Sequence, residues 1–356
     1  MDCQSTRVST RNFTIDDVAK AAGVARVTVS RVLNDVEKVR PETRERVRRA
    51  IDDLGYSVNH QARALASGMG RQIMLVHAHS PELEPNSYYN AGLEVGALRA
   101  CSSLGFDLVT RAVDPQHRNR VGLLCAILER EGPAGLILSP PLSDDLELIR
   151  AVQRAGVKVV AVSAGEEARV AVSAVGIDER GGGYAIGQHL VSLGHRRVGF
   201  INGPREHRAA MLRYHGFVNA LREAGIEHEP WTANGDFTFK SGVDAAERLL
   251  GSGLRLTALA CANDDMAAGA MLALHRAGLG IPADISVTGF DDTPMSEIVW
   301  PPLTTIRQPI KEFTERAVHM LVENGTNGDA RFDFLPYALV ERESTCAPNQ
   351  SLRLTE

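Results

Sequence analysis

Three polar residues in the second half of the sequence have side chains suited to holding a polyhydroxylated ligand. Arg213 offers a planar fork of hydrogen-bond donors, Asn263 offers a donor and an acceptor together, and Asp291 offers only an acceptor. We expect each of them at a strand end or in a loop. Because every sugar hydroxyl both donates and accepts, vicinal hydroxyls need this mixture of groups, which makes a sugar the favoured ligand.

An aromatic residue adds a fourth candidate. Phe237, in the segment 235–239, has a ring that can stack on a sugar or purine face. Three of the four candidates also have a structural alternative: Asp291 is suited to capping a nearby helix, Asn263 to capping the helix that contains Met266, and Phe237 to packing in the core. These alternatives stay open in the sequence, and Asn263 is able to cap a helix and bind a ligand at once.

Other patterns that suggest chemistry are incomplete. The glycines at 181–183 do not follow a strand in GxGxxG spacing and lack the Lys-Ser/Thr of a phosphate loop. His189 and His195 have no nucleophile and carboxylate beside them, and the five cysteines are scattered without a CxxC pair. We therefore expect no catalysis, no cofactor, no metal and no disulfide framework.

The charge distribution separates a basic head from an acidic body. Residues 1–71 contain 13 Lys and Arg against 9 Asp and Glu, whereas the other 285 residues contain 26 against 35. A basic head on an acidic body suggests that only the head contacts a polyanion. With no apolar run of membrane-spanning length and no apolar region at the N-terminus, a cytoplasmic protein is expected.

The head has the pattern of a helix-turn-helix. Thr14 is a natural N-cap for a helix that ends at Ala22, Gly23 supplies a tight turn, and a second helix covers 25–34. A third helix begins near Pro41 and ends at Leu54. Val29, Val32 and Val47 are among the residues expected to face inward.

The body alternates apolar strands with amphipathic helices. The expected strands are 72–76, 106–109, 135–138, 158–162, 197–201, 258–261 and 285–289. The expected helices are 91–103, 120–131, 142–155, 182–193, 213–224, 240–250 and 264–277. This alternation predicts two doubly wound α/β lobes that divide near Val175, with a ligand in the cleft between them.

Several segments closely resemble the lactose-repressor (LacI/GalR) family. In the head these are 14–34, 39–47 and 54–59, and in the body 175–178, 189–197, 213–217, 262–269, 287–292 and 301–308. The resemblance covers almost the whole chain and implies an all-α helix-turn-helix head on a periplasmic-binding-protein-like body. It also implies a hinge helix in the segment 60–68.

The resemblance assigns roles to residues. It implies that Arg26, Val27 and Arg31 read bases, and that Leu65 of the hinge inserts into the minor groove. The residues expected to contact phosphate or sugar are Thr14, Thr28, Ser30, Asn34 and Tyr56. Arg213, Phe237, Asn263 and Asp291 match effector-binding positions of the family.

Three positions depart from the family pattern. Ala25 replaces the usual serine at the start of the recognition helix, and Val58 replaces the usual proline before the hinge. Ser163 stands where lactose-type relatives carry a sugar-binding aspartate, which argues against lactose-like specificity.

The expected domains are a DNA-binding head at 12–58, a hinge at 59–70 and an effector-binding and dimerisation domain at 71–348. In the body the N-lobe is expected at 71–174 and 307–328, and the C-lobe at 175–306 and 329–348. The resulting hypothesis is a homodimeric repressor of carbohydrate-utilisation genes that binds a pseudo-palindromic double-stranded operator and responds to a sugar. A purine-type corepressor is the main alternative. A transport-type sugar-binding protein and a sugar kinase with a regulatory head fit the residues less well.

Overall fold

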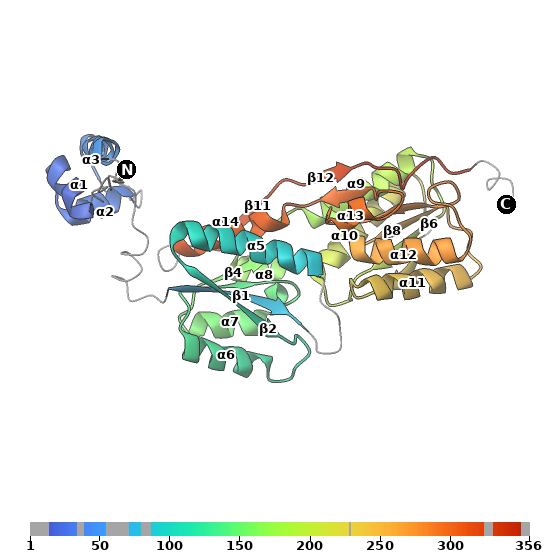
Figure 1. Cartoon of the computed structure of the whole chain (residues 1–356), viewed down its shortest axis with the longest axis horizontal. Helices are drawn as coiled ribbons and strands as arrows, with labels where there is room; N and C mark the ends of the chain where they lie inside the picture. Colours follow the sequence, from blue (N-terminus) through green and yellow to red (C-terminus); the bar gives the residue numbers. More distant parts are fainter. Residues whose placement is uncertain are drawn as a thin grey trace, which may run out of the picture. The chain divides into compact units, whose positions relative to one another are not determined.

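The computed structural model describes residues 14–33, 39–54, 71–79, 87–227, 229–323 and 330–349. The chain divides into two compact units, residues 1–66 and 67–356 (Figure 1). The first is the head and the second the body, and each is described by itself. The expected hinge and the residues Asn34, Tyr56 and Leu65 lie outside the described residues.

The head consists of three helices where the sequence predicts them: α1 Ile15–Ala22, α2 Arg26–Leu33 and α3 Pro41–Leu54. Thr14 caps α1 in a capping box, in which its hydroxyl accepts from the Asp17 backbone N–H and the Asp17 carboxylate accepts from the Thr14 backbone N–H. Gly23 ends α1 with φ of 62°, a left-handed conformation that suits glycine. The tight turn between α1 and α2 therefore follows from local sequence.

A small apolar core holds these helices together. Val18 of α1, Val29 of α2 and Val47 of α3 are fully buried, one from each helix. Ile51 and Leu54 pack against this core from α3 while remaining half-buried. The predicted inward residues that the structure describes therefore meet at the centre of the head.

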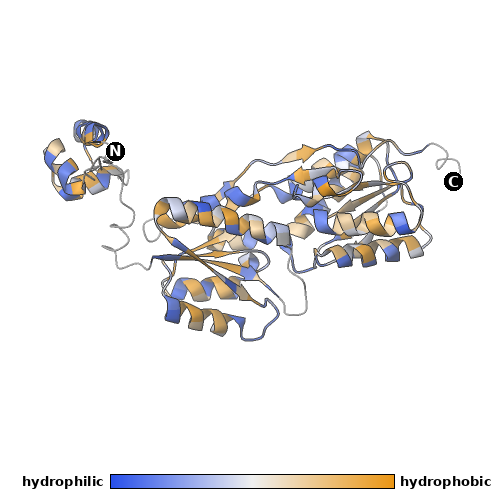
Figure 2. Ribbon diagram, in the orientation of Figure 1, coloured by the Kyte–Doolittle hydropathy of each residue, from blue (hydrophilic) through white to orange (hydrophobic). Residues whose placement is uncertain are grey.

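The N-lobe of the body is built on a parallel six-stranded sheet with the order β11-β5-β4-β3-β1-β2. Its strands are β1 Gln72–Ala78, β2 Asp107–Val113, β3 Gly135–Leu138, β4 Val159–Val162, β5 Ser173–Gly176 and β11 Phe332–Phe334. Its helices are α5 Ser87–Leu104, α6 Arg120–Glu131, α7 Leu146–Arg154, α8 Glu166–Ala171 and α14 Ile310–Glu323, with a 3-10 turn at Leu142–Asp144. The central strands are apolar and buried beneath these helices (Figure 2).

The C-lobe contains a parallel four-stranded sheet with the order β7-β6-β8-β9. Its strands are β6 Val198–Asn202, β7 Trp231–Asn234, β8 Ala258–Cys261 and β9 Ser286–Thr288. Its helices are α9 Glu179–Ser192, α10 Arg208–Glu223, α11 Phe239–Gly251, α12 Asp264–Arg276 and α13 Met295–Ile298. Helix α9 packs along α10, and α11 packs along α12 (Figure 1).

The chain passes between the lobes three times. It leaves the N-lobe after β5, returns after β10 (Thr305–Arg307), and leaves again after β11 to form β12 (Ala338–Val340), which pairs antiparallel with β10. The expectation that everything from residue 329 onward lies in the C-lobe is wrong for β11. Phe332–Phe334 pairs with β5, so the N-lobe sheet gains a strand before the last crossing.

Glycines make the contact between α9 and α10 unusually close. A Cβ atom placed on Gly183 of α9 would lie 1.9 Å from the backbone oxygen of Arg213, and one on Gly216 of α10 would lie 1.9 Å from that of Arg180. The two helix backbones touch at these points, so the position of α10 depends on the absence of side chains there.

No helix within the described ranges is long and apolar enough to cross a membrane.

Candidate ligand-binding cavity and nucleic-acid interface

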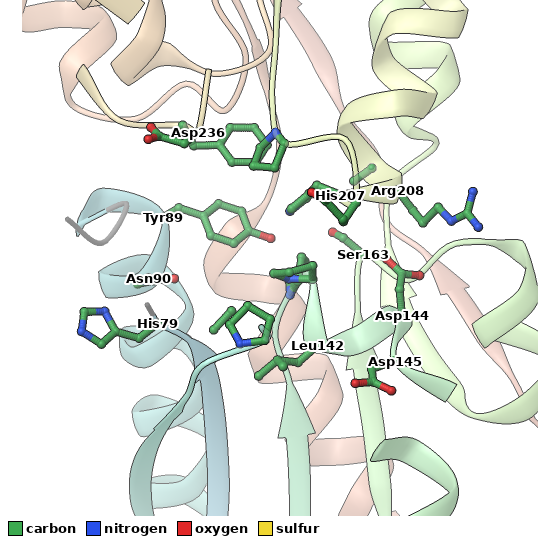
Figure 3. A pocket seen from close by; sticks show the side chains of 18 of the residues that line it. His79, Tyr89, Asn90, Leu142, Asp144, Asp145, Ser163, His207, Arg208 and Asp236 are labelled. Carbon is green, nitrogen blue, oxygen red and sulfur yellow. The ribbon is translucent and has the colours of Figure 1, made fainter. Parts of the chain in front are cut away.

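The body contains a cavity of about 820 Å³ whose wall comes from both lobes. Tyr89 at the start of α5, Leu142 and Ser163 line it from the N-lobe, and His207 and Phe237 line it from the C-lobe. Figure 3 shows Leu142 and His207 on opposite sides of this space. The volume falls in the upper part of the range of roughly 300–1,000 Å³ that is typical of small-molecule sites.

Arg213 is the buried cation of the cavity wall. Its Nε donates to Glu179 Oε2 at 2.8 Å and its Nη1 donates to the backbone oxygen of Ala262 at 2.7 Å. The guanidinium carbon lies 3.8 Å from the centre of the Phe290 ring. Burial disfavours its charge, but Glu179 and Asp291 outweigh this effect and raise the pKa of Arg213. The guanidinium is thus fixed in place before any ligand binds.

Asp291 lies beside this cation. Its Oδ1 is 3.6 Å from Arg213 Nη1 and accepts from Gln308 Nε2 at 2.5 Å, while its backbone N–H donates to the Ile306 oxygen. Burial raises the pKa of Asp291 above its usual range, although the charge of Arg213 opposes this shift. Asp291 also has a φ of 117°, a strained value for a non-glycine residue.

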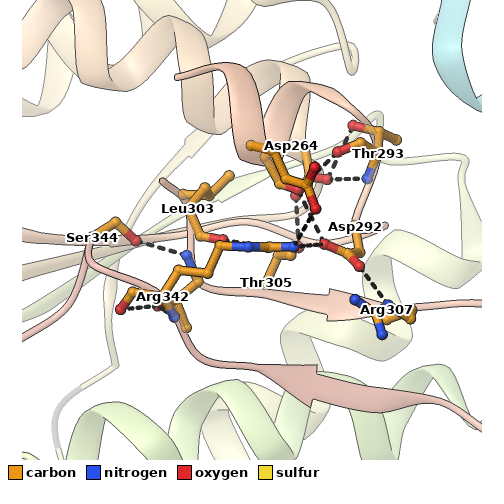
Figure 4. A network of polar contacts seen from close by, with 11 residues as sticks. Asp264, Asp292, Thr293, Leu303, Thr305, Arg307, Arg342 and Ser344 are labelled. Atoms are coloured by element: carbon orange, nitrogen blue, oxygen red, sulfur yellow. Dashed lines mark hydrogen bonds and ion pairs between the residues drawn. The ribbon is translucent and has the colours of Figure 1, made fainter. Parts of the chain in front are cut away.

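The neighbouring residue, Asp292, connects this loop to the crossover strands (Figure 4). Its carboxylate accepts from Arg307 Nε of β10 at 2.5 Å and from Arg342 Nη2, just after β12, at 2.6 Å. Buried Asp264 accepts from the Thr293 backbone N–H at 2.7 Å and from the Thr305 hydroxyl at 2.6 Å. The loop that carries Asp291 is therefore fixed to both strands that join the lobes.

An aromatic pair forms part of the C-lobe wall. The rings of His207 and Phe237 meet edge to face with their centres 4.8 Å apart. His207 caps α10, because its Nδ1 accepts from the Ala210 backbone N–H at 3.4 Å. Burial and the charge of Arg213 lower the pKa of His207 to about 3, so the ring is neutral and its Nε2 carries the proton.

Three of the four predicted ligand residues lie on the cavity wall, and the fourth lies behind it. Arg213, Phe237 and Asp291 line the cavity, but Asn263 is not among its described lining residues. Asn263 is instead the N-cap of α12, accepting from the Met266 backbone N–H, and its Nδ2 donates to the backbone oxygen of Phe237 at 3.0 Å. Its side chain thus holds Phe237 in a left-handed conformation, with φ of 69°.

Two details differ from the sequence expectation. Arg213 lies inside α10 rather than at a strand end, because α10 begins five residues earlier than expected. The expected helix 142–155 is broken by Asp145, which caps α7. Sequence reasoning singled out neither Tyr89 nor His207 as a cavity residue, although the place of His207 before a helix was a usable capping signal.

The exposed surface of α2 is the candidate nucleic-acid interface. Arg26, Val27 and Arg31 are exposed, with Val27 59 % accessible although apolar. Thr28 and Ser30 are half-buried. Arg26 Nη1 lies 3.7 Å from Asp16 Oδ2, but both groups are largely exposed, so this pair is weak and a base or phosphate can compete for the arginine.

Comparison with known families gives two matches. Residues 14–59 match the family described as bacterial regulatory proteins of the lacI family. Residues 187–345 match the periplasmic binding protein-like domain. The first match covers the three helices of the head. The second covers most of the C-lobe together with β10, α14, β11 and β12.

Similar proteins span nearly the whole chain. The regulator CelR of Thermobifida fusca is 35 % identical over 89 % of this chain and 93 % of its own length. The HTH-type transcriptional repressor PurR of Haemophilus influenzae is 33 % identical over 92 % of this chain and 98 % of its own length. The lactose operon repressor of Escherichia coli is 33 % identical over 94 % of this chain and 91 % of its own length.

Solved structures give the same picture. A CelR–cellobiose complex has a TM-score of 0.69 at 33 % identity and covers 94 % of this chain and 100 % of its own. The dimeric lac repressor bound to operator and an anti-inducer has a TM-score of 0.70 at 30 % identity over 95 % and 100 %. Both proteins combine a head and a body of the kind described above.

Proposed function

Because the chain belongs to the LacI family of bacterial regulatory proteins, we propose that it represses carbohydrate-utilisation genes and that a sugar in the body cavity controls its binding to operator DNA. The observation that carries this proposal is the buried Arg213–Asp291 pair on the wall of a cavity in a chain that also carries a helix-turn-helix head. Such a protein acts where the chromosome is, in the cytoplasm, and needs no catalytic step.

The head reads DNA through α2. Arg26 is suited to guanine O6 and N7, and Val27 offers an apolar contact that suits the thymine methyl group. Thr14, Thr28 and Ser30 act on the phosphate backbone, together with Asn34 and Tyr56, and Leu65 acts as the minor-groove wedge. The protein acts as a homodimer, so that each head reads half of a pseudo-palindromic operator, as the solved lac repressor dimer is bound to its operator.

The cavity supplies donors and acceptors together. Arg213 and the neutral His207 donate, Asp291 accepts, and the ring of Phe237 offers an apolar face. This is the mixture that vicinal hydroxyls require. Asn263 contributes by positioning Phe237. The solved CelR–cellobiose complex supports a sugar as the ligand class.

A purine is the second candidate ligand. The edge-to-face pair of His207 and Phe237 suits a flat aromatic ring, and several relatives are transcriptional repressors named PurR. The two candidates differ in sign, since a sugar acting as inducer releases the operator whereas a purine corepressor strengthens binding. In either case the effector and the operator must change each other's affinity by the same factor.

A thermal-shift screen of the full chain tests the proposal. A ligand at 100 times its Kd stabilises the folded state by about 2.7 kcal/mol, which is readily detected. The panel contains mono-, di- and trisaccharides, sugar phosphates and purines, with Asp291→Ala as the site control. A saccharide shift that disappears in this variant supports the sugar proposal. A purine shift supports corepression, and no shift with any saccharide rules out the sugar.

A further inference from the structure

The N-lobe wall of the cavity contains two adjacent carboxylates with very different surroundings, Asp144 and Asp145. Asp145 is fully engaged in the fold. Its Oδ1 accepts from the Glu147 and Leu148 backbone N–H groups at 3.1 Å, and its Oδ2 pairs with Arg120. Its role is to cap α7, and no acceptor oxygen remains free of protein contacts.

The side chain of Asp144 is held in place by one hydrogen bond, but most of its acceptor sites have no partner among the described residues. Its Oδ1 accepts from the Gly165 backbone N–H at 2.7 Å. Its Oδ2 is buried and has no hydrogen-bond partner among the described residues. A carboxylate has about four acceptor sites, so one contact leaves most of its capacity unused in a partly buried position. Such a group gains free energy when a ligand donates a hydrogen bond to it.

The surroundings of Asp144 favour a neutral, hydroxyl-bearing partner. Asp144 is the last residue of the 3-10 turn Leu142–Asp144, and its contact with Gly165 places it near Ser163 on the loop after β4. Figure 3 shows Asp144 and Ser163 on the same side of the space, with Arg208 of the C-lobe nearby. Burial raises the pKa of Asp144, although the hydrogen bond from the Gly165 backbone N–H and the charge of Arg208 oppose this shift and stabilise the carboxylate.

Asp236, another carboxylate on the wall, is also already engaged. Its Oδ1 accepts from both the backbone N–H and the hydroxyl of Thr238, so it serves its own loop. Among the described lining residues that are at least partly buried, Asp291 on the C-lobe wall and Asp144 on the N-lobe wall are therefore the candidate acceptors for ligand hydroxyls. A cavity of about 820 Å³ has room for more than one sugar ring.

On the basis of the proposed sugar response, we propose that Asp144 is a second effector-binding carboxylate and that the effector is an oligosaccharide of at least two rings. One ring donates hydroxyls to Asp291 beside Arg213, and the next ring donates to Asp144. Asp144 thereby selects for ligand length, because a single ring that occupies the Arg213 end makes no contact with it.

Isothermal titration calorimetry on the full chain tests this assignment. The ligands are glucose, cellobiose, maltose and lactose, and the variants are Asp144→Asn and Asp144→Ala. Asp144→Asn keeps an acceptor for the Gly165 N–H and so preserves the loop, and thermal melting checks that each variant is folded. Glu166→Gln on exposed α8 is the matched control, since it removes the same charge from the same lobe outside the cavity.

We expect the disaccharide that the wild type binds best to lose affinity about tenfold or more in Asp144→Asn and further in Asp144→Ala. Glucose affinity should change less than twofold, and Glu166→Gln should match the wild type with every ligand. Equal disaccharide affinity in wild type and Asp144→Asn overturns the role of Asp144 while leaving the sugar response intact. If the wild type binds no saccharide, both proposals fail together. If it binds glucose but no disaccharide, the proposal on ligand length alone is overturned.

Discussion

Replacing Gly183 with alanine should disturb the ligand site from a distance. The added Cβ would lie 1.9 Å from the backbone oxygen of Arg213, whereas non-bonded atoms need roughly 3.5 Å. The obstacle is backbone and not a flexible side chain, so α9 and α10 must separate by more than about 1 Å. Because α10 carries Arg213, this movement displaces the guanidinium from Glu179 and the Ala262 oxygen.

The size of the effect follows from the contact. Overpacking in a close-packed interior costs about 1–3 kcal/mol, and a backbone clash belongs at the upper end. For a large domain each kcal/mol lowers Tm by about 2–4 °C, so a cost of about 3 kcal/mol in Gly183→Ala should lower the Tm of the body by about 6–12 °C. The affinity of the protein for its effector should fall by at least tenfold, because the Arg213 guanidinium moves.

Scanning calorimetry of the full chain measures the change in Tm, and titration measures the effector affinity. Gly251→Ala is the matched control: it lies at the end of α11, and a Cβ there meets nothing within 4 Å. Alanine at that helical position should leave Tm equal or slightly higher. If Gly183→Ala melts within about 1 °C of the wild type and binds effector normally, the proposed dependence of Arg213 on this helix contact is refuted.

Three further results are expected. Arg26→Ala should change preference at one base step, by about 1–3 kcal/mol, while Ser30→Ala weakens all operator variants alike; equal losses across variants for both in a mobility-shift series would contradict this division. Thr14→Ala removes the capping box with Asp17, so hydrogen exchange of α1 amides in the full chain should quicken about fivefold, whereas unchanged exchange would contradict the cap's role. Burial raises the pKa of Asp264 to about 7, above its unfolded value of about 3.9, so the stability associated with its protonated form is lost as pH rises through 7; from pH 5 to 8 the wild-type Tm should fall relative to that of Asp264→Asn, and parallel curves would argue against the shift.

The head was predictable because its signals are local. Thr14, Gly23 and Pro41 are cap, turn and first-turn residues, and each acts on the residues next to it. The strands β3, β4 and β8 of the body were predictable because they are continuous apolar runs buried on both faces. The sequence therefore predicts the family and the architecture of the two lobes.

The strands β7 and β11 were not predictable in this way. In β7 half-buried and exposed residues alternate over only four positions, and β11 joins the N-lobe sheet through pairing with β5, more than 150 residues earlier. The candidate site contains residues that the sequence predicts and residues whose role depends on contacts between distant segments. Arg213 and Asp291 stand out by type, but the unused acceptor sites of Asp144 become visible only when the loop of Gly165 is placed against it.

Asp291 and Asp292 are consecutive residues with left-handed backbones that face different partners. One lines the ligand cavity, and the other pairs with Arg307 and Arg342 at the strands joining the lobes. Two consecutive residues therefore connect the ligand cavity directly to the strands that join the lobes. Residues on the opposite wall, such as Ser163, have no part in this linkage, so they are free to vary. Evolution can redirect such a protein to a new nutrient by changing that wall while the transmission of the signal stays the same.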